Sequence, residues 1–170
     1  MKKLSLKIKI LIGIIVLFIV YNIFWSVFTY IRWRPFCEPL EYIGDGDYSL
    51  FVGERGKKGR YIYGAFLPQY LSYAGNLSIS RGEVRTEDIP KVSMLIFPKL
   101  DGYEIYVKIY KMVMDETGLN GKQELMGTII LDENMEYYYE PTEEEERFFE
   151  EYKDDIAEVY EEMNKMWEIN

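Results

Sequence analysis

The chain has 170 residues and a formal net charge of -9 at pH 7. Residues 1–34 carry six basic residues and no acidic one, so the remainder carries -15. Such an acidic remainder excludes nucleic acid as the expected partner, because clustered lysine and arginine bind phosphate backbones. Histidine is absent and Cys37 is the single cysteine, which excludes imidazole catalysis, an intrachain disulfide and Cys/His zinc sites.

A long uncharged segment follows the basic N-terminus. Residues 10–31 hold no charge and are rich in isoleucine, valine, leucine and phenylalanine, and as a helix they would span roughly 33 Å. A backbone in lipid must satisfy its own hydrogen bonds, so we expect a transmembrane helix despite the many β-branched residues. The lipid bilayer is therefore the first expected partner.

A cleaved signal peptide is the alternative, since a lysine-rich start before an apolar run also describes one. The run exceeds the roughly 7–15 apolar residues of a signal peptide, and no pair of small residues precedes Arg32. We therefore expect a retained signal-anchor. Basic residues are more numerous before the segment than after it. This bias predicts that residues 1–9 form a cytoplasmic tail and that the C-terminal domain is extracytoplasmic.

Asn22 is the polar residue near the middle of the span. Its amide could bond a partner helix, an interaction worth roughly 0.6–2 kcal/mol in membranes. It could equally bond the local backbone or a water molecule. The sequence leaves both alternatives open, and Asn22 is a candidate interaction residue.

The segment after the anchor changes character. Pro35 and Pro39 disfavour a continuous helix, so we expect residues 32–41 to form an extended linker to a domain at 42–170. Short apolar or aromatic runs then alternate with glycine and proline, which is typical of β-strands. The predicted strands are 48–52, 60–66, 77–80, 92–97, 103–113, 124–131 and 135–139, with turns at 115–122 and 132–134. This spacing predicts an antiparallel meander.

The last predicted element is an acidic amphipathic helix over 143–167. Thr142 and Glu145 have the capping-box spacing, and acidic residues in the first turn suit the helix dipole. Apolar residues recur three and four positions apart, with aromatic residues beside the stripe. A coiled coil with another helix is one explanation, but a widened stripe is typical of a helix packed on its own domain. We expect it to pack on the sheet.

Several motifs have a plain structural explanation. Asp45-Gly46-Asp47 could suggest calcium, but the positions that follow lack the glycine and glutamate of a calcium loop, so we expect a turn. The glycines and lysines at 53–59 match no nucleotide-binding loop and predict a hairpin connection, whose lysines could touch an anionic envelope polymer. The acidic run at 143–162 is expected to be a solvated helix face, and no metal site is expected.

Sixteen tyrosines raise the question of sugar binding, since flat rings stack on sugars. Tyrosine also suits half-buried strand faces, which should account for most of them. Tyr106, Tyr110 and Tyr138 share their predicted strand faces with charged residues and are the candidate interaction residues of the domain.

These patterns predict an α+β protein, with an N-terminal transmembrane helix, a mainly antiparallel β domain and one C-terminal amphipathic acidic helix. No nucleophile elbow or Ser-x-x-Lys pair is present, so we expect neither an enzyme nor a cofactor. The leading hypothesis is an extracytoplasmic interaction or ligand-binding domain, with a protein or an envelope polymer as partner. The alternative is an accessory subunit of a membrane complex that assembles through the anchor and the C-terminal helix.

Overall fold

The structure of the protein is a computed structural model, which describes residues 5–52, 61–70, 72, 74–81, 90–114 and 121–170. The chain divides into two compact units, residues 1–35 and 36–170. The hairpin connection predicted at 53–59 and residues 115–120 of the turn predicted at 115–122 lie outside the described residues. Gly121 and Lys122, the last two residues of that predicted turn, belong instead to a strand.

Helix α1 (Leu6–Cys37) contains the uncharged segment. Within the described residues it is the one helix long and apolar enough to cross a membrane, which is consistent with single-pass anchoring. The helix predicted for 10–31 is confirmed, but the extended linker is wrong in its first part. The helix continues through Pro35 and ends at Cys37, because proline itself adopts helical φ and removes one hydrogen bond close to a helix end.

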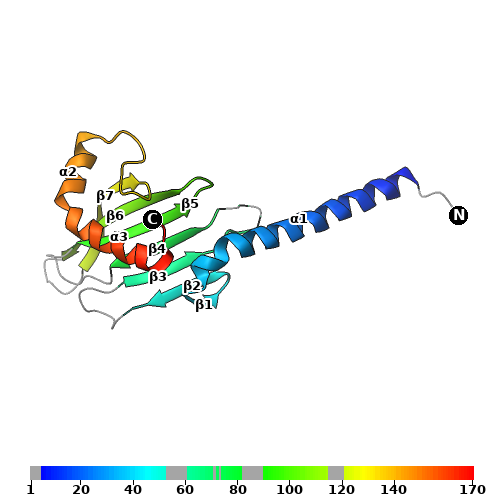
Figure 1. Cartoon of the computed structure of the whole chain (residues 1–170), viewed down its shortest axis with the longest axis horizontal. Coiled ribbons are helices and arrows are strands. Elements are labelled where there is room, and N and C mark those ends of the chain that lie inside the picture. Colours follow the sequence, from blue (N-terminus) through cyan, green and yellow to red (C-terminus); the bar gives the residue numbers. More distant parts are fainter. Residues whose placement is uncertain (1–4, 53–60, 71, 73, 82–89, 115–120) are drawn as a thin grey trace. The chain divides into compact units, whose positions relative to one another are not determined.

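Seven described strands form one antiparallel sheet, in which each strand pairs with the next one along the chain (Figure 1). This order confirms the predicted meander and, with the helices, the α+β class. The strands are β1 (Glu41–Gly44), β2 (Asp47–Phe51), β3 (Tyr61–Phe66), β4 (Asn76–Arg81), β5 (Lys91–Pro98), β6 (Tyr103–Met114) and β7 (Gly121–Leu131).

The two ends of the meander differ from the prediction. Strand β1 was not predicted, because Gly44 follows after only three strand residues. The strand predicted at 135–139 is wrong: the chain makes only an isolated bridge there, between Leu131 and Tyr137. Met135 has φ of 65°, a left-handed conformation that interrupts an extended strand.

The hairpin between β1 and β2 explains the Asp45-Gly46-Asp47 sequence. Gly44 pairs with Asp47, so that Asp45 and Gly46 form a two-residue loop. Both loop residues have positive φ, 51° and 87°. This is the conformation of a type I′ turn, for which Asp-Gly is a preferred sequence. The motif is an ordinary turn, as predicted.

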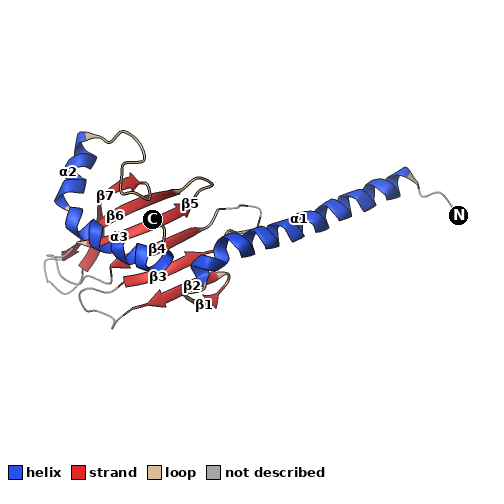
Figure 2. Ribbon diagram, in the orientation of Figure 1, coloured by secondary structure: helices blue, strands red, loops and turns tan. Residues whose placement is uncertain are grey.

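The C-terminal helices α2 (Glu143–Glu151) and α3 (Lys153–Trp167) lie on one face of the sheet (Figure 2). We call this the helix face and the opposite one the open face. Strands β4 to β6 turn alternate apolar residues to the helix face, where they are fully buried. Helix α3 adds Ile156, Val159, Met163 and Trp167 to the same core. The expected packing of the apolar stripe on the sheet is confirmed.

The single helix predicted at 143–167 is broken at Tyr152, which has φ of -111° and ψ of 16°. The break separates a helix over β7 from one over β4 and β5. Because a sheet twists, one straight helix does not follow both ends of its surface. The break therefore lets each half pack on its own strands, although the sequence contains no proline or glycine there.

The start of α2 follows the sequence closely. Thr142 Oγ1 accepts a hydrogen bond from Glu145 N at 3.3 Å, and Glu145 Oε2 accepts one from Thr142 N at 2.8 Å. This is the predicted capping box. Helix α2 also requires Gly127, because a Cβ there would lie 2.6 Å from Cζ of Phe148.

Candidate functional site

The open face of the sheet is unusual in its mixture of residues. Neither α2 nor α3 covers it, yet aromatic and aliphatic side chains share it with lysines and serines. An uncovered antiparallel face is normally mostly polar. Its side chains on β4 to β7 are Asn76, Ser78, Ser80, Lys91, Ser93, Leu95, Phe97, Glu104, Tyr106, Lys108, Tyr110, Met112, Met114, Gln123, Leu125, Thr128 and Ile130.

Tyr106 is held rigidly on this face. Its hydroxyl donates a hydrogen bond to Glu104 Oε1 at 2.8 Å, and Glu104 Oε2 pairs with Lys99. The Tyr106 ring meets Phe97 edge-on, with centroids 5.3 Å apart. The bond to Glu104 raises the pKa of Tyr106, and the bonds from Lys99 and Tyr106 lower the pKa of Glu104. The ring position is fixed by contacts on two sides.

Tyr138 lies close enough to this group to interact electrostatically with both Tyr106 and Lys99. Its backbone N–H donates to Ile130 O at 3.0 Å, which ties the segment after β7 to the sheet, and its side chain is 51% exposed. The structure thus brings two of the predicted interaction residues together. Tyr139 joins the same corner, and its hydroxyl donates to Glu145 Oε1 at 2.5 Å.

Tyr110 lies on the same face of β6, four residues along the strand from Tyr106. It pairs with Lys91 of the neighbouring strand β5, and Lys91 Nζ lies 6.0 Å from the centroid of the Tyr110 ring. This distance is at the limit of a cation–π contact. Lys108 lies between the two tyrosines on β6 and was not singled out from the sequence, because one lysine in an alternating strand carries no signal by itself.

Asn22 belongs to the unit of residues 1–35, whereas the three tyrosines belong to the unit of residues 36–170. Its Nδ2 donates a hydrogen bond to Phe18 O at 2.7 Å. This contact is the local backbone bond, one of the two alternatives left open by the sequence. An interaction of Asn22 with a partner helix stays a prediction.

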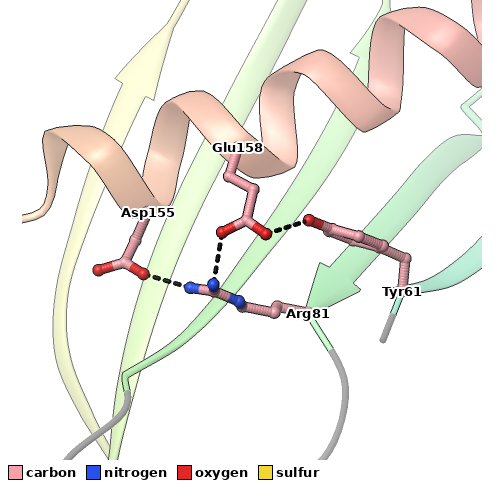
Figure 3. A network of polar contacts seen from close by, with 4 residues as sticks. All are labelled: Tyr61, Arg81, Asp155 and Glu158. Atoms are coloured by element: carbon pink, nitrogen blue, oxygen red, sulfur yellow. Dashed lines mark hydrogen bonds and ion pairs between the residues drawn. The ribbon is translucent and has the colours of Figure 1, made fainter. Parts of the chain in front are cut away.

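On the helix face, a polar network fastens α3 to the sheet (Figure 3). Arg81 pairs through one nitrogen with Asp155 and through another with Glu158. Tyr61 donates its hydroxyl to Glu158 Oε1 at 2.9 Å. Arg81 is the one charged residue that is buried in the described part of the chain. Two of the acidic residues expected on a solvated helix face therefore have a structural partner.

Tyr63 extends this arrangement towards the C-terminus of α3. Its hydroxyl donates to Glu162 Oε2 at 3.2 Å, and Glu162 also pairs with Lys165 at 2.7 Å. Burial, together with Glu162, raises the pKa of Tyr63 to about 12. Burial and the bond to Glu158 raise the pKa of Tyr61 as well. Both phenols are neutral donors over the physiological range and serve to hold the helix.

A surface pocket of about 310 Å³ lies where α2 begins beside β7. It is lined by Met126, Gly127, Thr128 and Phe148, together with Thr142, Glu144 and Glu145 at the start of the helix. Glu145 already bonds Thr142 and Tyr139, so its carboxylate is engaged in capping. Among the described residues, no group of three or more His, Cys, Asp or Glu side chains is arranged to hold a metal ion.

No family model matches the chain, and neither curated proteins nor solved structures provide a match.

Proposed function

We propose that this protein is a membrane-tethered binding protein whose domain lies outside the cytoplasm and presents the open face to a ligand or partner. The observation that carries the proposal is the open face itself, where Tyr106, Tyr110 and Lys108 remain uncovered by α2 and α3. A sheet face of this composition is costly to leave without a role, because exposed apolar patches favour unwanted association. The proposal assigns binding and no catalysis.

The tether is supported by α1, whose apolar residues suit a bilayer in length and composition. The excess of lysine before the span supports a cytoplasmic N-terminus. Sidedness can be tested at Leu100, which is 95% exposed. In a Cys37→Ser background, Leu100→Cys should react with a membrane-impermeant maleimide in intact cells. Labelling only after permeabilisation would overturn the extracytoplasmic placement.

Binding through the open face is tested with the full chain in nanodiscs, offered envelope polymers and secreted proteins in turn. Replacing Tyr106 and Tyr110 by alanine should weaken capture of the ligand at least about tenfold. The matched control replaces Lys153 and Lys165 by glutamine, since both are exposed on α3. Equal capture by both variants would contradict a role for the open face.

The accessory-subunit hypothesis has less support. The apolar stripe of α3 is buried against β4 and β5, so assembly would depend on α1 and on the charged surface of the C-terminal helices. Crosslinking of the full chain in membranes, compared with Asn22→Leu, tests this function. A specific crosslinked complex that disappears in Asn22→Leu would favour it over the binding function proposed above.

A further inference from the structure

The register of the sheet places four hydrogen-bonding side chains in one row across the open face. Ser80 pairs with Ser93, Ser93 with Lys108, and Lys108 with Thr128. We call these four residues the polar lane. Directly paired residues on neighbouring antiparallel strands lie about 5 Å apart, so the lane extends roughly 15 Å across β4 to β7. All four side chains are partly exposed.

The polar lane has unused bonding capacity. Within the part of the chain that the structure describes, Lys108 forms no ion pair, and the hydroxyls of Ser80, Ser93 and Thr128 form no hydrogen bond. Lys99, by contrast, is paired with Glu104 at the end of the same face. The lane therefore offers one uncompensated ammonium group flanked by hydroxyls that can donate or accept.

Aromatic rings border the polar lane on β6. Tyr106 and Tyr110 lie two residues before and two residues after Lys108, and so on the same side of the strand. Tyr106 is fixed by Phe97 and Glu104, and Lys91 lies beside Tyr110. Two flat rings on either side of a cation suit a ligand that has apolar ring faces as well as negative charge.

Charge complementarity selects the ligand further. The helix layer, residues 141–170, carries 12 acidic and 3 basic residues. On the open face of β4 to β7, the described charged strand residues are Lys91, Lys108 and Glu104, with Glu104 already neutralised by Lys99. The open face is thus locally basic within an acidic domain. An anionic ligand would be directed to it and repelled from the helix layer.

We propose that the polar lane and its bordering tyrosines bind an anionic polysaccharide, with a carboxylate on Lys108, sugar hydroxyls on the serines and threonine, and sugar rings against Tyr106 and Tyr110. This inference rests on the proposed function and specifies its ligand class. A purely polyanionic ligand would use the lysines but leave the tyrosine rings without a role. A neutral polysaccharide would leave Lys108 unpaired.

The experiment uses the full chain in phosphatidylcholine nanodiscs and three probes: polygalacturonate, neutral dextran and poly-L-glutamate. Polygalacturonate should bind at least about tenfold more tightly than either of the others. Lys108→Gln and Tyr110→Ser should each weaken its binding about tenfold, whereas Tyr110→Phe, which keeps the ring, should retain it. Lys165→Gln on α3 is the matched charge control and should change nothing. Near-UV circular dichroism of each variant verifies the fold.

Three results would overturn the inference: no binding of polygalacturonate, equal binding of poly-L-glutamate or of dextran, or binding that Lys108→Gln and Tyr110→Ser leave unchanged. These outcomes are distinct from failure of the proposed function. If polygalacturonate does not bind but the Tyr106 and Tyr110 alanine variant still loses capture of another ligand, the open face binds and only the anionic sugar is excluded. If that variant loses nothing either, both proposals fall.

Discussion

The two faces of the sheet are built from the same strands but differ in the burial and pairing of their side chains. On the helix face, alternate apolar residues of β4 to β6 are fully buried, and Arg81 and Tyr63 pair with carboxylates of α3. On the open face, the neighbouring residues of the same strands are only partly buried, and Lys108 has no partner among the described residues. The difference places the packed core on one face, whereas the other face is the one to which we assign binding as a proposal.

The largest expected effect on stability comes from a substitution that creates a cavity under α3. Ile156 is fully buried, so Ile156→Ala should lower the free energy of unfolding by about 3 kcal/mol through lost burial and an unfilled cavity. Leu125→Ala on the open face, where the side chain is 53% exposed, should change it by less than about 1 kcal/mol. Urea unfolding of the full chain in detergent, followed by near-UV circular dichroism, measures both. Similar losses would contradict the comparison.

A smaller effect is expected from the network at Arg81. Arg81→Gln leaves Asp155 and Glu158 without their counter-charge, and should lower the free energy of unfolding by about 2 kcal/mol. The loss stays below that for a fully buried pair because the side chains of Asp155 and Glu158 are 30% and 45% exposed, and water compensates in part.

Lys153→Gln is the control for this network, since it removes an exposed pair with Glu150 on the same helix. It should alter the free energy of unfolding by less than about 0.5 kcal/mol. The same urea titration compares the two variants. If Lys153→Gln lowered the free energy of unfolding as much as Arg81→Gln, the Arg81 network would contribute no more to stability than an exposed ion pair.

The smallest effect is the response to alkaline pH. Folding raises the pKa of Tyr63 from its ordinary value of 10.0 to about 12. Its contribution is fully present below pH 10 and is lost as pH rises towards 12, because the phenol ionises first in the unfolded chain. Between pH 9 and pH 11 this costs about 1 kcal/mol. In Tyr63→Phe the pH dependence of the unfolding midpoint should be correspondingly flatter, and an unchanged slope would contradict the assignment.

Elements whose signal is local were predictable from the sequence. The uncharged run of α1, the alternation in β6, the capping box at Thr142 and the Asp45-Gly46 turn each depend on residues a few positions apart. Tyr106 and Tyr138 could also be selected, because each has charged residues close by in the sequence. The proximity of these two tyrosines could not be predicted from the sequence. It depends on how the segment after β7 folds back and bonds Ile130.

The sequence by itself determined the long apolar helix, most of the meander and the amphipathic character of the C-terminal segment, because hydrophobic periodicity and turn chemistry act between residues close together in the chain. Only the tertiary structure decided that α1 runs on to Cys37, that the C-terminal helix breaks at Tyr152, and that Ser80, Ser93, Lys108 and Thr128 form one row. The helix break depends on packing against a twisted sheet and the row depends on strand register, so both depend on residues far apart along the chain. The extension of α1 depends instead on Pro35 lying close enough to the helix end for the lost hydrogen bond to be tolerated.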